Sequence, residues 1–129
     1  MCICGGGNGA HVLAGTASVQ PGIEARVLTL FADEAERWTN KMKNNEFFLR
    51  VHEKKTSKEV KAGTFIVTKD TTKAVSGADI IVLVVPAFAH AGYLEAIKPH
   101  IKPGMVIVGL PGQSGFEFLV RGILWEDAK

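Results

Sequence analysis

Three small residues near the start of the chain have the spacing of a phosphate-binding turn. Gly5, Gly7 and Ala10 fit the pattern G-x-G-x-x-G/A and directly follow a short apolar run. In this pattern the first glycine permits a tight turn, the second lets the backbone approach a pyrophosphate, and the third small residue lets a helix lie close to a strand. The helix start then offers unpaired N–H groups and a partial positive charge to the phosphates. A glycine-rich turn without a ligand has a similar composition. The elements on either side of the turn must therefore distinguish a phosphate-binding turn from a plain one.

A second group of candidate residues follows the next apolar run. A carboxylate at the end of the second strand of such a fold normally binds the 2′-hydroxyl of the adenosine ribose. Here Leu30 and Phe31 stand at that place, and Asp33 lies slightly beyond. Asp33 and Glu36 have the spacing of a capping box, so Asp33 is expected to cap the following helix, to contact the ribose, or to do both. Arg37 is a candidate for a 2′-phosphate, but it lies a turn into the helix, where a solvated side chain is expected.

Three other polar side chains each have two open interpretations. His90 follows an apolar strand and is either an acid or base near a nicotinamide or a histidine on a helix surface. His11 either lines the phosphate pocket or is simply exposed. Gln113 stands in a glycine-flanked loop, where a neutral amide can donate to a substrate carboxylate or carbonyl or can remain solvated.

The sequence assigns neither a catalytic residue nor a metal site. Cys2 and Cys4 lie two apart in an apolar run, so both side chains are expected on one face of a strand, as buried reduced thiols. No nucleophile–base pair, metal-ligand cluster or pair of carboxylates at a defined spacing stands out. The reduced thiols fit a cytoplasmic location.

Strands and helices alternate along the sequence and predict the framework that positions these residues. Ile80–Val85 and Met105–Val108 are apolar at every position, which is typical of strands buried on both faces of a parallel sheet. The other expected strands are the residues up to Cys4, Ala25–Phe31, Phe47–Val51, Glu59–Ala62 and Thr64–Thr68. The expected helices are Asn8–Ser18, Asp33 to about Lys43, Asp70–Val75, Ala87–Lys98 and Phe116–Leu124. The fold class is therefore α/β, a Rossmann-type doubly wound, mostly parallel sheet with an inserted β-hairpin.

The carboxyl ends of the strands should form the binding edge of this sheet. Ligands of open α/β sheets bind there, at the switch point of the strand order. The loops expected at this edge are Gly5–Ala10, Phe31–Glu34, Pro86–His90 and Gly109–Gly115. Because the glycine turn lies between a strand and a helix, as its mechanism requires, we expect a nucleotide-binding site at this edge.

The composition describes an ordinary globular domain. The 129 residues are 47% hydrophobic and 22% charged, with a formal net charge of +2, which gives no reason to expect nucleic acid or a membrane as a partner. No basic region followed by a long apolar run marks a signal peptide. We expect one dinucleotide-binding domain over residues 1–129. Because Met1 begins inside the first strand, we expect this domain to be a fragment.

Several segments resemble the opine dehydrogenases, and together they cover nearly the whole chain. They are Cys4–His11, Val27–Trp38, Ser76–Asp79, Val85–His90 and Gly109–Phe118. Members of this family join an amino acid to pyruvate or a related 2-keto acid through an imine, which NADH reduces to a secondary amine. They have an N-terminal Rossmann domain and a C-terminal helical domain, with the substrates in the cleft between them. The resemblance implies an NAD-dependent oxidoreductase acting on CH–NH donors, with NADPH less expected than NADH.

The resemblance also implies roles for individual residues. Gly6–Gly9 would hold the pyrophosphate, Phe31–Glu34 the adenosine end, and Gln113 matches a position that contacts the keto acid. L-arginine is the default amino acid, while alanine, glycine and taurine stay open. The family's catalytic histidine lies in the C-terminal domain, which is absent here, so we expect this chain to bind cofactor without turnover. The full set of cofactor candidates is Gly5, Gly6, Gly7, Asn8, Gly9, Ala10, Phe31, Ala32, Asp33, Glu34, Val85, Pro86 and Ala87.

Two other functions compete with this interpretation. One is the N-terminal domain of a glycerol-3-phosphate- or ketopantoate-type dehydrogenase. The sequence of Phe31–Glu34 argues against this alternative. The other is a free-standing dinucleotide-binding or sensor module with no chemistry of its own.

Overall fold

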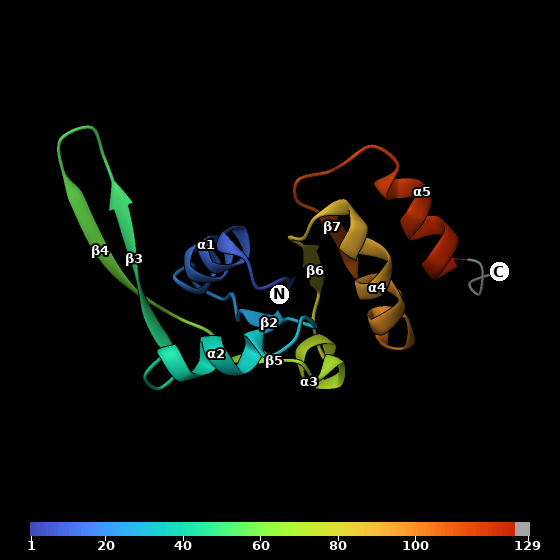
Figure 1. Ribbon diagram of the computed structural model, residues 1–129, viewed down its shortest axis with the longest axis horizontal. Coiled ribbons are helices and arrows are strands. Elements are labelled where there is room, and N and C mark those ends of the chain that lie inside the picture. Colours follow the sequence, from blue (N-terminus) through green and yellow to red (C-terminus); the bar gives the residue numbers. More distant parts are fainter. Residues whose placement is uncertain (126–129) are drawn as a thin grey trace.

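A parallel sheet forms the centre of the computed structural model, which describes residues 1–125. Its five strands have the order β5-β2-β1-β6-β7, and every neighbouring pair is parallel (Figure 1). The strands are β1 (Cys2–Cys4), β2 (Arg26–Leu28), β5 (Ile66–Thr68), β6 (Ile80–Leu83) and β7 (Val106–Gly109). The chain builds the sheet outward from β1 on one side and then crosses to β6 on the other. This order confirms the predicted Rossmann-type, doubly wound fold and places the switch point at β1.

Helices cover both faces of the sheet. Ala10 of α1 is buried in one cluster with Ile3, while Leu94 of α4 is buried in a second cluster with Cys2 and Cys4. Side chains alternate along a strand, so β1 contributes to both clusters. The helices are α1 (Asn8–Ser18), α2 (Glu34–Lys41), α3 (Thr71–Val75), α4 (Ala87–Ile97) and α5 (Phe116–Val120), with a 3₁₀ turn η1 (Lys98–His100) and a π-helical turn η2 (Arg121–Trp125). No helix within residues 1–125 is both long and apolar enough to cross a membrane.

The two thiols of β1 lie where the sequence predicts them. Cys2 and Cys4 are free, buried and on the same face of the sheet. A hydrogen bond with Cys2, together with burial, raises the pKa of the Cys4 thiol well above its ordinary value. Cys4 therefore stays protonated near neutral pH and is a weak nucleophile.

The predicted β-hairpin is confirmed and is longer than the sequence indicates. It consists of β3 (Glu46–His52) and β4 (Ser57–Gly63), which pair antiparallel and form a sheet of their own. Figure 1 shows the hairpin projecting away from the central sheet. Leu49, midway along β3, lies against Gly15 of α1, where a Cβ would overlap the leucine side chain. The hairpin is thus held against α1.

Some predicted boundaries and burial patterns are wrong. The last strand is not fully buried, because β7 stands at the edge of the sheet, and Val106 and Val108 are 52% and 36% exposed. β2 and β6 are shorter than the apolar runs that predicted them. Apolar residues continue beyond both strands because the loops at the carboxyl edge also pack against the core.

Candidate dinucleotide-binding site

The loops that follow β1, β2 and β6 meet at the carboxyl edge of the sheet. Gly5 N donates a hydrogen bond to Leu28 O at 2.8 Å, and Val84 N donates to Cys4 O at 2.8 Å. These bonds extend the sheet by one residue into the loops. The glycine turn consequently lies between the loops after β2 and β6, at the switch point where such sheets bind ligands.

The glycine turn has a closed inner side and an open outer side. Gly5 has a φ of 135°, which side chains rarely allow, and a Cβ there would lie 2.5 Å from Val84 O. Around Gly7, by contrast, no described atom lies within 4 Å of the place that a Cβ would occupy. Ala10 is fully buried, which lets α1 lie close to the sheet. This shape leaves room for a pyrophosphate over Gly7, at the N-terminus of α1.

The carboxylate beside the glycine turn is that of Glu34. Glu34 is the first residue of α2, and its Oε2 accepts a hydrogen bond of 2.6 Å from the Thr29 hydroxyl. The same oxygen fills the space next to Gly6, because a Cβ built on Gly6 would overlap it. A carboxylate held here can accept hydrogen bonds from ribose hydroxyls and repels a phosphate at the same place.

Asp33 faces away from the turn, and the predicted capping box is wrong. Its carboxylate pairs with Arg37 Nε at 3.0 Å, and the two side chains are 62% and 59% exposed. Within residues 1–125 the Asp33 side chain makes no capping hydrogen bond. The physical reason is local, since its φ of −102° and ψ of 18° differ from the extended backbone of a normal N-cap. Arg37 is exposed, as predicted.

Phe31 and Ala32 complete the loop after β2. The Phe31 side chain is 69% exposed, so its ring is available to a flat ligand group. Ala32 has a φ of 41°, a left-handed conformation that is unfavourable for alanine. Its carbonyl accepts a hydrogen bond of 3.2 Å from Lys69 Nζ, which helps to hold the loop in this shape.

His11 is held beside the glycine turn by a hydrogen bond and by a stacked ring. Its Nδ1 lies 2.8 Å from Gly7 O, and its ring stacks on Trp38 with the centroids 3.6 Å apart. Because a carbonyl only accepts, Nδ1 carries the hydrogen of this bond. His11 therefore neither lines the open side of the turn nor is simply exposed. The sequence did not indicate the partner of His11, because Trp38 lies on α2 and meets α1 only in the folded domain.

His90 is not a helix-surface histidine, because its side chain is only 2% exposed. The ring meets the edge of Phe116 with the centroids 5.0 Å apart. Its Nε2 has no hydrogen-bond partner among the described residues. Such burial between α4 and α5 does not suit a proton donor to an open binding edge.

The remaining candidates stand on the other side of the glycine turn. Val85 is half-buried beside Gly5, and Pro86 and Ala87 are exposed where α4 begins. Gln113 is exposed in the loop between β7 and α5, and its carbonyl accepts a hydrogen bond of 3.1 Å from Phe116 N. The amide of Gln113 is thus open to a ligand at the same edge of the sheet. No group of three or more His, Cys, Asp or Glu side chains comes together as a metal site within residues 1–125.

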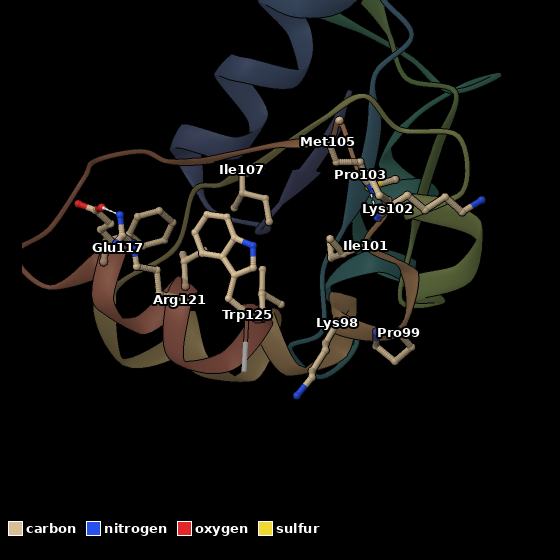
Figure 2. Close-up of a pocket in the computed structure, with 14 residues that line it drawn as sticks. Lys98, Pro99, Ile101, Lys102, Pro103, Met105, Ile107, Glu117, Arg121 and Trp125 are labelled. Carbon is tan, nitrogen blue, oxygen red and sulfur yellow. Dashed lines mark hydrogen bonds and ion pairs between the residues drawn. The ribbon is translucent and has the colours of Figure 1, made fainter. Parts of the chain in front are cut away.

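A separate apolar groove of about 960 Å³ lies between β7 and the C-terminal helical turns. Figure 2 shows Ile107 of β7 and Trp125 of η2 pointing into it, and Arg121 paired with Glu117 at its rim. Its lining residues, all between 98 and 125, are not among the cofactor candidates. The groove is therefore distinct from the glycine-turn site.

Comparisons with known proteins match nearly the whole chain. A family model described as the NAD-dependent glycerol-3-phosphate dehydrogenase N-terminus matches residues 2–122. The chain is 54% identical to octopine dehydrogenase of Pecten maximus over 129 residues, which are 99% of this chain and 32% of the relative. It is 55% identical to tauropine dehydrogenase of Arabella iricolor over 128 residues, which are 98% of this chain and 32% of the relative. The chain thus spans about one third of the length of these relatives.

A solved structure of octopine dehydrogenase with NADH and L-arginine has the same fold. It superposes on this chain with a TM-score of 0.93 at 54% sequence identity. The match covers 98% of this chain and 32% of that protein.

Proposed function

Because the chain belongs to the family of NAD-dependent glycerol-3-phosphate dehydrogenase N-terminal domains, we propose that it serves as the NADH-binding domain of an opine dehydrogenase. The observation that carries this proposal is the likeness to octopine dehydrogenase solved with NADH, at 54% identity over 98% of this chain. The open side of Gly7 at the switch point fits a bound dinucleotide.

In this proposal the cofactor crosses the glycine turn from the β2 side to the β6 side. The pyrophosphate lies over Gly5–Ala10, where the first turn of α1 supplies N–H groups. Glu34 accepts hydrogen bonds from the adenosine ribose, and the exposed ring of Phe31 lies against the adenine. Val85–Ala87 border the nicotinamide half. Asp33, which pairs with Arg37, is left without a ribose contact.

The whole enzyme would condense an amino acid with pyruvate or another 2-keto acid. The amine adds to the keto carbon, water leaves to form an imine, and hydride from NADH reduces the imine to the secondary amine. Gln113 would hold the keto acid by donating from its amide. A helical domain in the remaining two thirds of such an enzyme would bind the amino acid and supply the catalytic groups, so this chain alone would bind NADH without turnover. The cytoplasm, where NADH is available and thiols stay reduced, is the proposed location.

L-arginine remains the default amino acid, but this domain does not select it. The identity to octopine dehydrogenase and to tauropine dehydrogenase is nearly the same, 54% and 55%. The family description favours glycerol-3-phosphate dehydrogenase as the second candidate function.

We expect calorimetry to show tighter binding of NADH than of NADPH by this chain. Glu34→Gln should reduce the preference for NADH about tenfold, because it removes a charged acceptor for the ribose and the repulsion of a 2′-phosphate. Glu36→Gln is the matched control, since Glu36 is an exposed carboxylate on the same helix. No heat with either cofactor would contradict the cofactor assignment, and tighter binding of NADPH would overturn the choice of NADH.

A chimaera tests the enzymatic part of the proposal. This chain would replace the matching third of Pecten maximus octopine dehydrogenase, and NADH oxidation should require both pyruvate and an amino acid. Gln113→Ala in the chimaera should raise the KM for pyruvate about tenfold, as expected for losing one hydrogen bond to a charged group.

The matched control for Gln113 is Gln20→Ala, because Gln20 is also exposed but follows α1 at the other end of the helix from the glycine turn. Its KM for pyruvate should equal that of the unmodified chimaera. A folded chimaera that binds NADH but oxidises none with pyruvate and any of arginine, alanine, glycine or taurine would refute the opine dehydrogenase assignment.

A further inference from the structure

Two buried side chains link the core of the domain to the carboxylate beside the glycine turn. Thr29 follows β2 and is fully buried, and its hydroxyl donates to Glu34 Oε2 at 2.6 Å. Its backbone N–H donates to Thr68 O at 3.0 Å, which holds Thr29 beside the end of β5. Tyr93 reaches the same place from α4 on the other face of the sheet, and its hydroxyl accepts a hydrogen bond of 3.1 Å from Leu30 N.

Each of these hydrogen bonds has a defined direction. The Thr29 hydroxyl gives its hydrogen to Glu34 Oε2. The Tyr93 oxygen accepts from Leu30 N, which holds the backbone directly after Thr29. Burial raises the pKa of Tyr93, so the phenol stays neutral at neutral pH. Thr29 therefore holds the Glu34 carboxylate, and Tyr93 holds the backbone next to Thr29.

The Glu34 carboxylate has a second possible orientation, toward solvent. Glu34 is only half-buried and stands at the first residue of a helix, so without Thr29 its side chain could turn toward solvent. Asp33, its neighbour in sequence, has that outward orientation and pairs with Arg37. The hydroxyl of Thr29 is therefore the contact that keeps Glu34 against Gly6.

We propose that Thr29 and Tyr93 are positioning residues that hold Glu34 at the ribose site and thereby determine the preference for NADH over NADPH. The proposal rests on the proposed function, in which Glu34 binds the adenosine ribose. Neither residue needs to touch the cofactor. Thr29 acts directly on Glu34, and Tyr93 acts through the Leu30 backbone next to Thr29.

The test compares the affinities for NADH and NADPH by calorimetry in Thr29→Val, Thr29→Ser and Tyr93→Phe. Thr29→Val keeps the shape of the side chain but removes its hydroxyl, and the NADH to NADPH affinity ratio should fall about tenfold, as for Glu34→Gln. Thr29→Ser keeps the hydroxyl and should keep the ratio. Tyr93→Phe should lower the ratio about threefold, since it removes the acceptor for Leu30 N, one step further from Glu34. Thermal unfolding of each variant separates loss of fold from loss of selectivity.

Combining Thr29→Val with Glu34→Gln provides the decisive measurement. If both substitutions act through the same carboxylate, the double variant should have the ratio of Glu34→Gln alone. Should Thr29→Val weaken both cofactors equally, or should the two effects simply add, the positioning role is wrong while the ribose role of Glu34 stands. If Glu34→Gln itself leaves the ratio unchanged, Glu34 has no ribose role and this inference is wrong, while the proposed NADH binding stands. If the unmodified chain does not bind NADH, the proposed function itself is wrong.

Should Thr29→Val not fold, Tyr93→Phe and Thr29→Ser still decide the question. A selectivity ratio that is unchanged in Tyr93→Phe and reduced in Thr29→Ser would be the reverse of the expected order and would overturn the proposal.

Discussion

Gly7→Val is expected to weaken NADH binding by at least ~100-fold while the chain stays folded. Gly7 has φ −82° and ψ −174°, an extended conformation that valine adopts readily, and no described atom lies within 4 Å of its Cβ position. The new side chain therefore fills the space over the turn, where the pyrophosphate would approach. Displacing the phosphates would cost two or more charge-assisted hydrogen bonds from backbone N–H groups, each worth about 1.5–3 kcal/mol. Calorimetric titration with NADH measures the loss.

Gly92→Val is the matched control for this substitution. Gly92 lies in α4, where a Cβ also meets no described atom within 4 Å, and it is exposed. The same valine there should leave the affinity for NADH unchanged, and circular dichroism should show both variants folded. Wild-type affinity in a folded Gly7→Val variant would mean that the glycine sequence is only a turn.

Gly5→Ala is expected to lower the free energy of unfolding by about 3 kcal/mol. The φ of 135° disfavours any side chain, and the added Cβ would lie 2.5 Å from Val84 O. This oxygen belongs to the backbone directly after β6, so it cannot move aside as a flexible side chain would. Urea unfolding followed by circular dichroism gives the change, provided that the slope with urea concentration stays the same.

Gly77→Ala separates the two causes of that loss. Gly77 also has a positive φ, 75°, but no described atom lies within 4 Å of its Cβ position. Its cost should be about 1 kcal/mol, the backbone term alone. Equal losses in the two variants would show that the overlap with Val84 O contributes nothing.

The fold and the shape of the glycine turn were accessible from the sequence because their signals are local. The apolar run Ile80–Val85 predicted a strand next to a helix, and β6 and α4 are both present. The G-x-G-x-x-A spacing predicted a turn with one tightly packed glycine and one open glycine, which Gly5 and Gly7 are. Each of these features depends on residues within about ten positions of one another.

Predictions about single side chains failed where partners come from distant parts of the chain. His90 was assigned to a helix surface or an open site, yet α5 covers it through Phe116, which α4 meets only in the folded domain. β7 was expected to be buried on both faces, because its sequence is as apolar as that of β6. Its exposure follows from its place at the edge of the sheet, which no property of the strand itself encodes.

The sequence by itself determined the doubly wound fold and the glycine turn at Gly5–Ala10, because glycine spacing and strand and helix periodicity set local backbone shape. Only the tertiary structure decided that Glu34 and not Asp33 lies against the glycine turn. The two carboxylates are neighbours in sequence, so local pattern cannot separate them. They differ because the buried Thr29 hydroxyl donates a hydrogen bond to Glu34, while Asp33 pairs with Arg37 at the exposed surface.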